Sequence, residues 1–224
     1  MSNNFNPYDD NSDDDDLPDI APQMEQQGIV RVKKGEEINV TRIDPTIREI
    51  TVGVGWDLKR IEGDPVDVDA SLFLLDKNDK TREDEDFVFY NNLMAREGAV
   101  RHMGDSRTGA GDGDDEKIVV DLMALPFEIV RIAFVLSIYD LDMNSNNFTL
   151  VKNVYFRIVN NETTLETFRF ELDGDMGAGT GILIGFLERV GSDWIYKAAG
   201  DPIHGGLAKI AGDYGIVVTQ SLRG

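Results

Sequence analysis

GILIGFLERV (residues 181–190) and DWIYKAAG (residues 193–200) are two apolar segments that only Gly191 and Ser192 separate. A glycine at the first position of a two-residue loop is typical of a β-hairpin, so the pair predicts two antiparallel strands. TFRFEL (residues 167–172) alternates apolar and charged side chains, as a strand with one buried face does. These patterns favour an all-β fold.

Similar segments recur along the chain between Asp- and Asn-containing turns. Six of them are EITVGVGWD (49–57), DASLFLLD (69–76), DFVFYNN (86–92), KIVVDL (117–122), RIAFVLSIYD (131–140) and VKNVYFRIVN (151–160). Short strands separated by turn residues predict a two-sheet β-sandwich. Helical patterns are scarce: HGGLAKIAGDYG (204–215) predicts one short C-terminal helix, and ALPFEIV (124–130) predicts a single helical turn.

The first 27 residues differ from the rest in composition. They hold eight acidic residues, three prolines and no Lys or Arg, which predicts a disordered acidic tail. Subtracting its charge of −8 from the total of −20 leaves −12 for residues 28–224, which we expect to form one domain.

The overall charge and composition limit the function. A net charge of −20 argues against binding to a nucleic-acid backbone, because phosphate contacts require Lys and Arg. Cysteine is absent, which excludes disulfides and thiolate metal sites. The N-terminus has no signal-peptide pattern and no apolar run reaches membrane-spanning length, so we expect a cytoplasmic protein.

GDSRTGAGDGDDE (residues 104–116) carries five acidic residues and four glycines. Glycines let backbone carbonyls turn inward, and clustered carboxylates supply the oxygen ligands that Ca²⁺ takes, about 6–8 of them. With no cysteine and two histidines, the ligand set favours Ca²⁺ or Mg²⁺ over Zn²⁺. The alternative is a solvated acidic loop. The acids are Asp105, Asp112, Asp114, Asp115 and Glu116.

Two other site types are excluded. A phosphate-binding loop needs Lys after its second glycine, where Ala110 stands. An EF-hand at residues 140–151 would need Gly and Glu where Ser145 and Val151 stand.

Further oxygen donors follow or begin predicted strands. They are Asp57, Asp67, Asp69 and Asn91. Loops at one edge of a sandwich gather such residues, so we expect them near the acidic loop. Asn91 also suits an Asx turn, and Asp57 could simply close a turn.

Several segments, in order, resemble the TerD family of tellurite-resistance and stress proteins, over residues 28–219. They are TVGVGWD, DVDASLFLLD, DFVFYNN, GDSRTGAGDGDDEKIVVDL, NVYFRIVNNET, DWIYKAAG and GGLAKIAGDYGI. The resemblance implies a β-sandwich that binds Ca²⁺ at acidic loops. It also implies a stress-response role in the cytoplasm or at its membrane face, within complexes of other stress proteins.

The family's ligand pattern carries over to most of these acids. Its acidic loop corresponds to residues 105–116, its D-x-D-A-S block to Asp67 and Asp69, and its G-W-D block to Asp57. Two positions depart from it: Ser106 stands where the family usually has Asn, and Asp140 where relatives often have His.

No catalytic pattern is present. The sequence lacks a nucleophile elbow, and we expect His102 and His204 at the surface or in turns. We therefore expect a Ca²⁺-dependent interaction module rather than an enzyme, with peripheral membrane association only through partners. The alternative is a module that uses Ca²⁺ to bind a nucleotide, a cyclic nucleotide or another small molecule. A metal-dependent phosphoesterase is less favoured.

Overall fold

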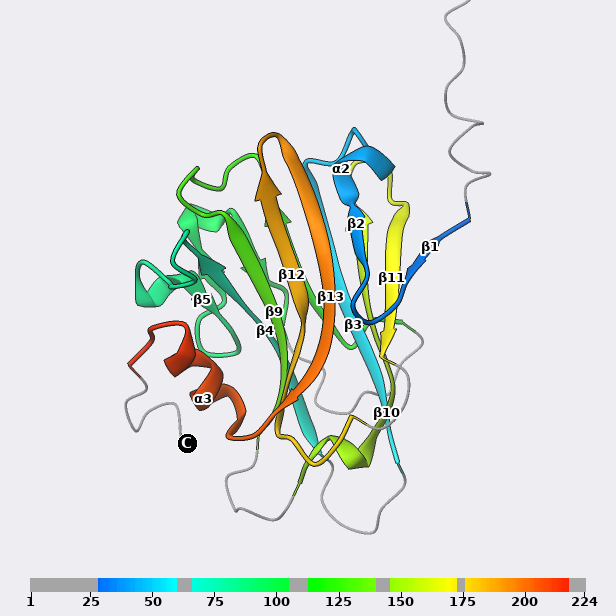
Figure 1. Ribbon diagram of the computed structural model, residues 1–224, viewed down its shortest axis with the longest axis vertical. Helices are drawn as coiled ribbons and strands as arrows, with labels where there is room; N and C mark the ends of the chain where they lie inside the picture. The colour runs from blue at the N-terminus through cyan, green and yellow to red at the C-terminus, as the bar shows by residue number, and fades with distance from the viewer. Residues whose placement is uncertain (1–27, 60–65, 105–112, 140–145, 173–175, 218–224) are drawn as a thin grey trace, which may run out of the picture.

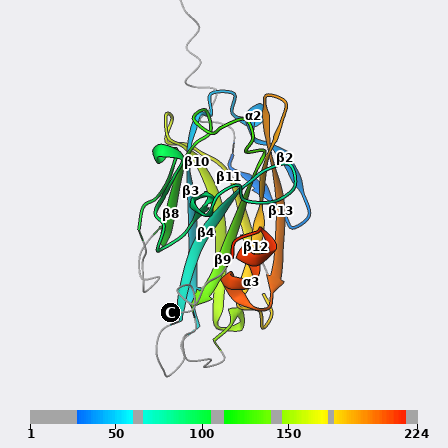
Figure 2. The same ribbon diagram turned by 90° about the vertical axis from the view of Figure 1, so that its left-hand side faces the viewer.

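The computed structural model describes residues 28–59, 66–104, 113–139, 146–172 and 176–217. Two β-sheets lie face to face, and the view in Figure 2 shows them as two layers. The sandwich predicted from the sequence is confirmed. The acidic tail, residues 1–27, lies outside the described residues, so its predicted disorder remains a prediction.

The larger sheet contains seven strands. In spatial order they are β1 (Val30–Val32), β11 (Glu166–Leu172), β10 (Val151–Asn160), β3 (Glu49–Leu58), β8 (Glu116–Asp121), β7 (Val100–His102) and β6 (Met94–Ala95). All neighbours are antiparallel except β1 and β11, which are parallel.

The smaller sheet contains six strands, all antiparallel. In spatial order they are β2 (Glu37–Asn39), β13 (Asp193–Ile203), β12 (Gly181–Val190), β9 (Arg131–Tyr139), β4 (Asp67–Leu75) and β5 (Phe87–Val88). The predicted hairpin is confirmed, since Val190 pairs with Asp193 across the two-residue turn.

The core lies between the sheets and is rich in aromatic side chains. Phe156 and Tyr196, from opposite sheets, stack with ring centroids 5.2 Å apart, and Phe168 lies 4.5 Å from Tyr196. In β11 the apolar side chains Phe168 and Phe170 point inward, as the alternation predicted.

The helices are short. They are α2 (Val40–Ile43), α3 (Gly206–Asp213) and three 3₁₀ turns, η1 (Asp84–Asp86), η2 (Arg96–Gly98) and η3 (Phe148–Leu150). The predicted C-terminal helix is α3, which covers the outer face of the smaller sheet (Figure 1) and encloses a second small core there. No helix that the structure describes is long and apolar enough to cross a membrane.

The helical turn predicted for residues 124–130 is wrong. This segment forms hydrogen-bonded turns instead, with the Ile129 N–H donating to the Pro126 carbonyl. Pro126 has no N–H to continue a helix from the preceding turn. The Ile129 side chain is fully buried and holds the segment against the core.

Candidate metal centre

Two glycines on β3 leave room on the outer face of the larger sheet. A Cβ added to Gly53 would lie 2.4 Å from Oδ2 of Asp114, and one added to Gly55 would lie 2.4 Å from the Tyr155 ring. The Asp114 carboxylate and the Tyr155 ring therefore rest directly on the β3 backbone. The two glycines are two residues apart on the strand, so both face the same side of the sheet.

Asp114 is held by a guanidinium fork. Its Oδ1 accepts from Nε of Arg157 (2.7 Å) and from the Tyr155 hydroxyl (3.0 Å), and its Oδ2 accepts from Nη2 of Arg157 (2.8 Å). The Asp114 side chain is 1% exposed. A bidentate, charge-assisted pair of this kind is among the strongest side-chain contacts.

The fork extends into a larger charged network. Nη1 of Arg157 donates to Glu166 (2.9 Å), and Nε of Arg169 donates to the other oxygen of the same carboxylate (2.7 Å). Burial raises the pKa of Glu166, but hydrogen bonds from Arg169 and Arg157 outweigh it, so the pKa is lowered. The Arg169 guanidinium also lies over the Tyr155 ring, 4.4 Å from its centroid. Four side chains from β10 and β11 thus fix Asp114.

Asp115 has a different environment from its neighbour. Its Oδ2 accepts from the Trp56 backbone N–H (2.8 Å), and the side chain is half-buried. Burial raises the pKa of Asp115, and the charges of Asp57 and Asp114 raise it further, while the Trp56 hydrogen bond lowers it. Two further carboxylates therefore lie close enough to repel this one.

Asp57 is exposed and is paired with an amide on β10. Its Oδ2 accepts from Nδ2 of Asn153 (2.6 Å). Asn153 has a positive φ of 52°, where the pairing register of β10 with β3 shifts between Lys152 and Tyr155. A β-bulge of this kind redirects side chains and is common beside functional sites. Here it directs the Asn153 amide toward the carboxylate end of β3.

These groups surround one hollow of about 390 Å³. Its lining includes Asp57, Asp115, Asn153, Tyr155, Arg157 and Arg169. Carboxylate and amide oxygens suit Ca²⁺, so the donor types present fit that ion. The described residues contain no group of three or more acidic, His or Cys side chains placed to hold a metal.

Glu116 lies on the inside of the sandwich, in line with the core residues Ile118 and Val120 of the same strand. Oε2 of Glu116, on β8, accepts from the Ala70 N–H on β4, so this carboxylate links the two sheets. His102 on β7 lies beside it, with Nε2 3.5 Å from Oε2 of Glu116. Asp69 is buried at 5% exposure, as its apolar strand context suggested.

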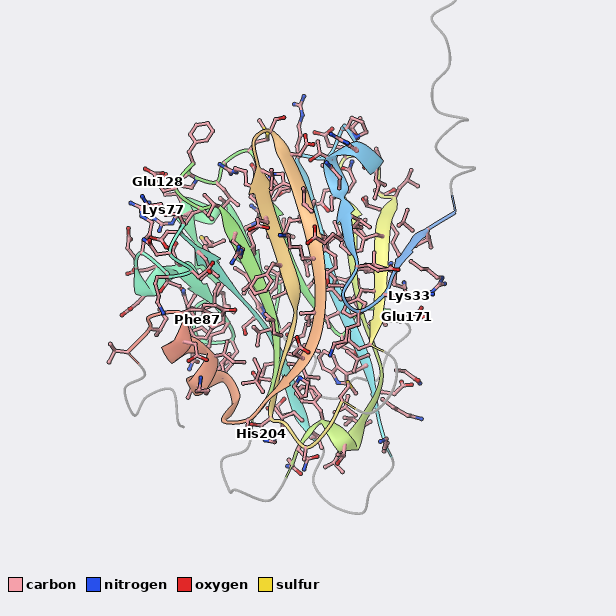
Figure 3. The ribbon with its side chains drawn as sticks, viewed as in Figure 1. Lys33, Lys77, Phe87, Glu128, Glu171 and His204 are labelled. Atoms are coloured by element: carbon pink, nitrogen blue, oxygen red, sulfur yellow. The ribbon has the colours of Figure 1, made fainter. Side chains whose placement is uncertain are left out.

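The expectation that His102 lies at the surface is wrong. Its Nε2 donates to the Ala70 carbonyl (3.2 Å), and its Nδ1 accepts from the Gly104 N–H (3.2 Å). Burial lowers the pKa of His102, but the hydrogen bond and charge of Glu116 outweigh it and the pKa is raised. His204 is exposed in the turn before α3 (Figure 3), as expected.

The remaining predicted ligands lie in three places. Asp67 is half-buried at the start of β4, opposite Tyr139 of β9. Asn91 is exposed in the tight turn that the Phe89–Asn92 bridge closes. Asp105 and Asp112 lie outside the described residues. The structure thus gathers Asp57, Asp114 and Asp115 on one side of the sheet, whereas Glu116 lies within the sandwich and Asp69 is buried on β4.

The side chains of β10 that contact the predicted acids were not expected from the sequence. Asn153, Tyr155 and Arg157 alternate on the outward face of β10, and each contacts one of the predicted acids. The alternation is visible in VKNVYFRIVN, and so are the two glycines of β3. Their partnership depends on the strand register, which the sequence alone does not specify.

The fold and this site define a two-sheet β-sandwich protein with carboxylates gathered where β3 ends and β8 begins. Residues 29–214 match the TerD domain family. The chain belongs to the TerD family.

The chain matches two similar proteins over nearly their full length. General stress protein 16U of Bacillus subtilis (strain 168) is 42% identical over 190 residues, covering 84% of this chain and 98% of the relative. The tellurium resistance protein TerD of Serratia marcescens is 40% identical over 187 residues, covering 84% and 97%. A crystal structure of a TerD homologue from Streptomyces coelicolor A3(2) has a TM-score of 0.60 at 18% identity, covering 74% and 95%, and supports the fold.

Proposed function

We propose that this protein is a Ca²⁺-binding stress-response protein of the TerD type. In this role Ca²⁺ joins the acidic loop of residues 104–116 to the end of β3, and the ordered end of the sandwich then binds other stress-response proteins in the cytoplasm. The protein acts as an interaction module and catalyses no reaction. The names of its relatives, a general stress protein and a tellurium resistance protein, support the stress-response part.

The observation that carries the Ca²⁺ proposal is the pair Asp57 and Asp115. The two carboxylates line the same hollow, and the charge of Asp57 raises the pKa of Asp115. Like charges repel each other, and a cation bound between the two carboxylates would remove that repulsion. Asp105 and Asp112 of the glycine loop would supply oxygens for the coordination positions that Asp57 and Asp115 do not occupy.

Calorimetric titration of the chelator-treated, full-length protein tests this proposal. We expect Ca²⁺ to bind in the micromolar range or tighter, and Mg²⁺ to bind more weakly under matched conditions, because a glycine-rich loop suits a larger and less regular shell. Equal or stronger Mg²⁺ binding, or no heat with either ion, contradicts it.

A second candidate function follows from the two guanidinium groups of the same hollow. Arg157 and Arg169 line the hollow together with Asp57 and Asp115. An anionic phosphate, bridged to the carboxylates by Ca²⁺, would also meet these cations, as in a Ca²⁺-assisted nucleotide-binding or cyclic-nucleotide-binding module. Nucleotide titration with and without Ca²⁺ separates the two functions: binding only in the presence of Ca²⁺ favours the second. A phosphatase assay with added metals tests the phosphoesterase alternative.

A further inference from the structure

A basic groove lies beside the candidate metal site, where β1 runs beside β11, and Arg169 lines both. It has a volume of about 460 Å³, and four cations line it: Arg31, Lys33, Lys34 and Arg169. Glu171 is the one acid of that lining among the described residues. Figure 3 shows Lys33 and Glu171 together at this flank, far from Lys77 on the other side of the molecule. Because the protein as a whole has a net charge of −20, this local cluster of cations is a candidate binding site for an anionic partner.

The geometry of the strands explains why the cations gather. Arg31 and Arg169 lie directly opposite each other in the parallel β1–β11 pair. Like charges in this relation are destabilising unless anions lie nearby. Arg31 is paired with Glu171, and Lys34 with Asp201, but all four side chains are between 46% and 63% exposed. Exposed pairs of this kind contribute about 0–1 kcal/mol, so another carboxylate can readily replace Glu171 or Asp201.

Apolar side chains also contribute to the lining of the groove. They are Val32, Phe170, Leu172 and Met176, and each is less than a tenth exposed, so they offer little apolar surface to a partner. The four cations are therefore the main feature that a partner would meet, and they fit a peptide rich in carboxylates.

We propose that the occupant is the acidic segment of this chain's own N-terminus, residues 13–24. Its sequence, DDDDLPDIAPQM, places Asp16 and Asp19 beside Leu17 and Ile20. Residues 1–27 carry eight acids and no Lys or Arg. The segment cannot build a core of its own, and the groove offers its carboxylates four cations.

Chain connectivity makes this occupant favoured over a free peptide. Four residues, 25–28, separate the segment from Ile29, and β1, which begins at Val30, lines the groove through Arg31 and Val32. A tether this short gives an effective concentration on the order of millimolar. Pro18 and Pro22 each have a fixed φ in any conformation of the chain, which lowers the entropy lost on docking. This inference does not depend on Ca²⁺ binding.

Paramagnetic relaxation in the full-length protein tests it. The chain has no cysteine, so Ser12→Cys accepts a single nitroxide label. We expect the amide signals of residues that line the groove, such as Val32 and Phe170, to lose intensity several-fold more than those of α3. Reduction of the nitroxide provides the diamagnetic reference.

Charge reversal provides the matched comparison. Lys33→Glu with Lys34→Glu should restore the groove signals, because the docked segment would then be repelled. Lys77→Glu with Lys209→Glu, which reverses two exposed lysines elsewhere, should leave the effect intact. Uniform broadening, or broadening that both variants leave unchanged, overturns the proposal. So does broadening of an unlabelled, isotope-enriched protein mixed with spin-labelled protein, since the contact would then join two copies.

Discussion

Asp114 and Asp115 are adjacent in the sequence but have opposite surroundings. Asp114 is enclosed by a guanidinium fork and a tyrosine hydroxyl, whereas Asp115 faces a hollow that also contains Asp57. Sequence reasoning treated both as equivalent ligands. The structure gives Asp114 an ion pair with Arg157, whereas the charges of Asp57 and Asp114 raise the pKa of Asp115, so substitutions of the two residues should have different effects.

Asp114→Asn should destabilise the protein by about 2 kcal/mol, because Arg157 would lose a charged partner in a partly buried place. Chemical unfolding of the full-length protein in chelator measures this. Lys117→Ala is the control, since its ammonium is exposed and lies 3.8 Å from Asp114, and it should cost less than about 0.5 kcal/mol. Equal losses from the two variants would show that the fork contributes nothing special.

Asp115→Asn should leave the metal-free protein as stable or slightly more stable at pH 7. A carboxyl whose pKa is raised on folding stabilises the folded state fully below its unfolded pKa, and that stability is lost as pH rises through the folded pKa. At pH 7 the ionised group is therefore unfavourable, and the amide removes this effect. The gain should be less than about 1 kcal/mol, since water screens a half-exposed group.

Unfolding in chelator at pH 7 and near pH 4 measures the effect of Asp115→Asn. The advantage of the variant should shrink at the lower pH, where Asp115 becomes protonated in the parent protein. A variant that is clearly less stable than the parent at pH 7 would mean that the ionised carboxylate supports the fold.

At the scale of elements, the close contact between β3 and its covering side chains should tolerate no added methyl group. Gly53→Ala would force the Asp114 carboxylate off the sheet, and Gly55→Ala would displace the Tyr155 ring. Each should destabilise by about 1–3 kcal/mol. Gly212→Ala in α3 is the control, because nothing lies within 4 Å of its added Cβ and alanine favours a helix. Thermal unfolding of the three variants compares them, and similar small changes at all three positions would contradict the packing described.

The longer elements could be predicted from the sequence because their apolar patterns are strong. VKNVYFRIVN corresponds to β10 residue for residue, and the Gly191–Ser192 hairpin is where the turn rule places it. Short strands such as β1 and β6 carry too few residues to show a period. Strand β1 is held by its pairing with β11, a contact between residues far apart in the chain.

At the scale of the whole molecule, Ca²⁺ should raise stability. Ca²⁺ at 100 times its dissociation constant adds about 2.7 kcal/mol if it binds only the folded state. For a domain of this size that corresponds to a rise of about 5–10 °C in Tm. Thermal melts in chelator, excess Ca²⁺ and excess Mg²⁺ test this, and coincident curves in chelator and Ca²⁺ would count against it.

The candidate site was predictable in its chemistry and only partly in its geometry. Oxygen donors at strand ends indicated where carboxylates would gather, and Asp57 and Asp115 do share a hollow. The sequence did not reveal that Glu116 and His102 would turn inward, because a one-residue change of register exchanges the two faces of a strand. Nor did it reveal the Asn153 bulge, which depends on the pairing between β10 and β3.

The most direct test of the central claim is a calorimetric Ca²⁺ titration of full-length Asp115→Asn beside the parent and Asp121→Asn. Asp121 is a matched control: it is also half-buried and accepts backbone N–H groups, from Met123 and Ala124, but at the other end of β8. We expect at least a tenfold loss of Ca²⁺ affinity, about 1.4 kcal/mol, for Asp115→Asn, and the parental Ca²⁺ affinity for Asp121→Asn. Parental Ca²⁺ affinity in both variants would contradict it.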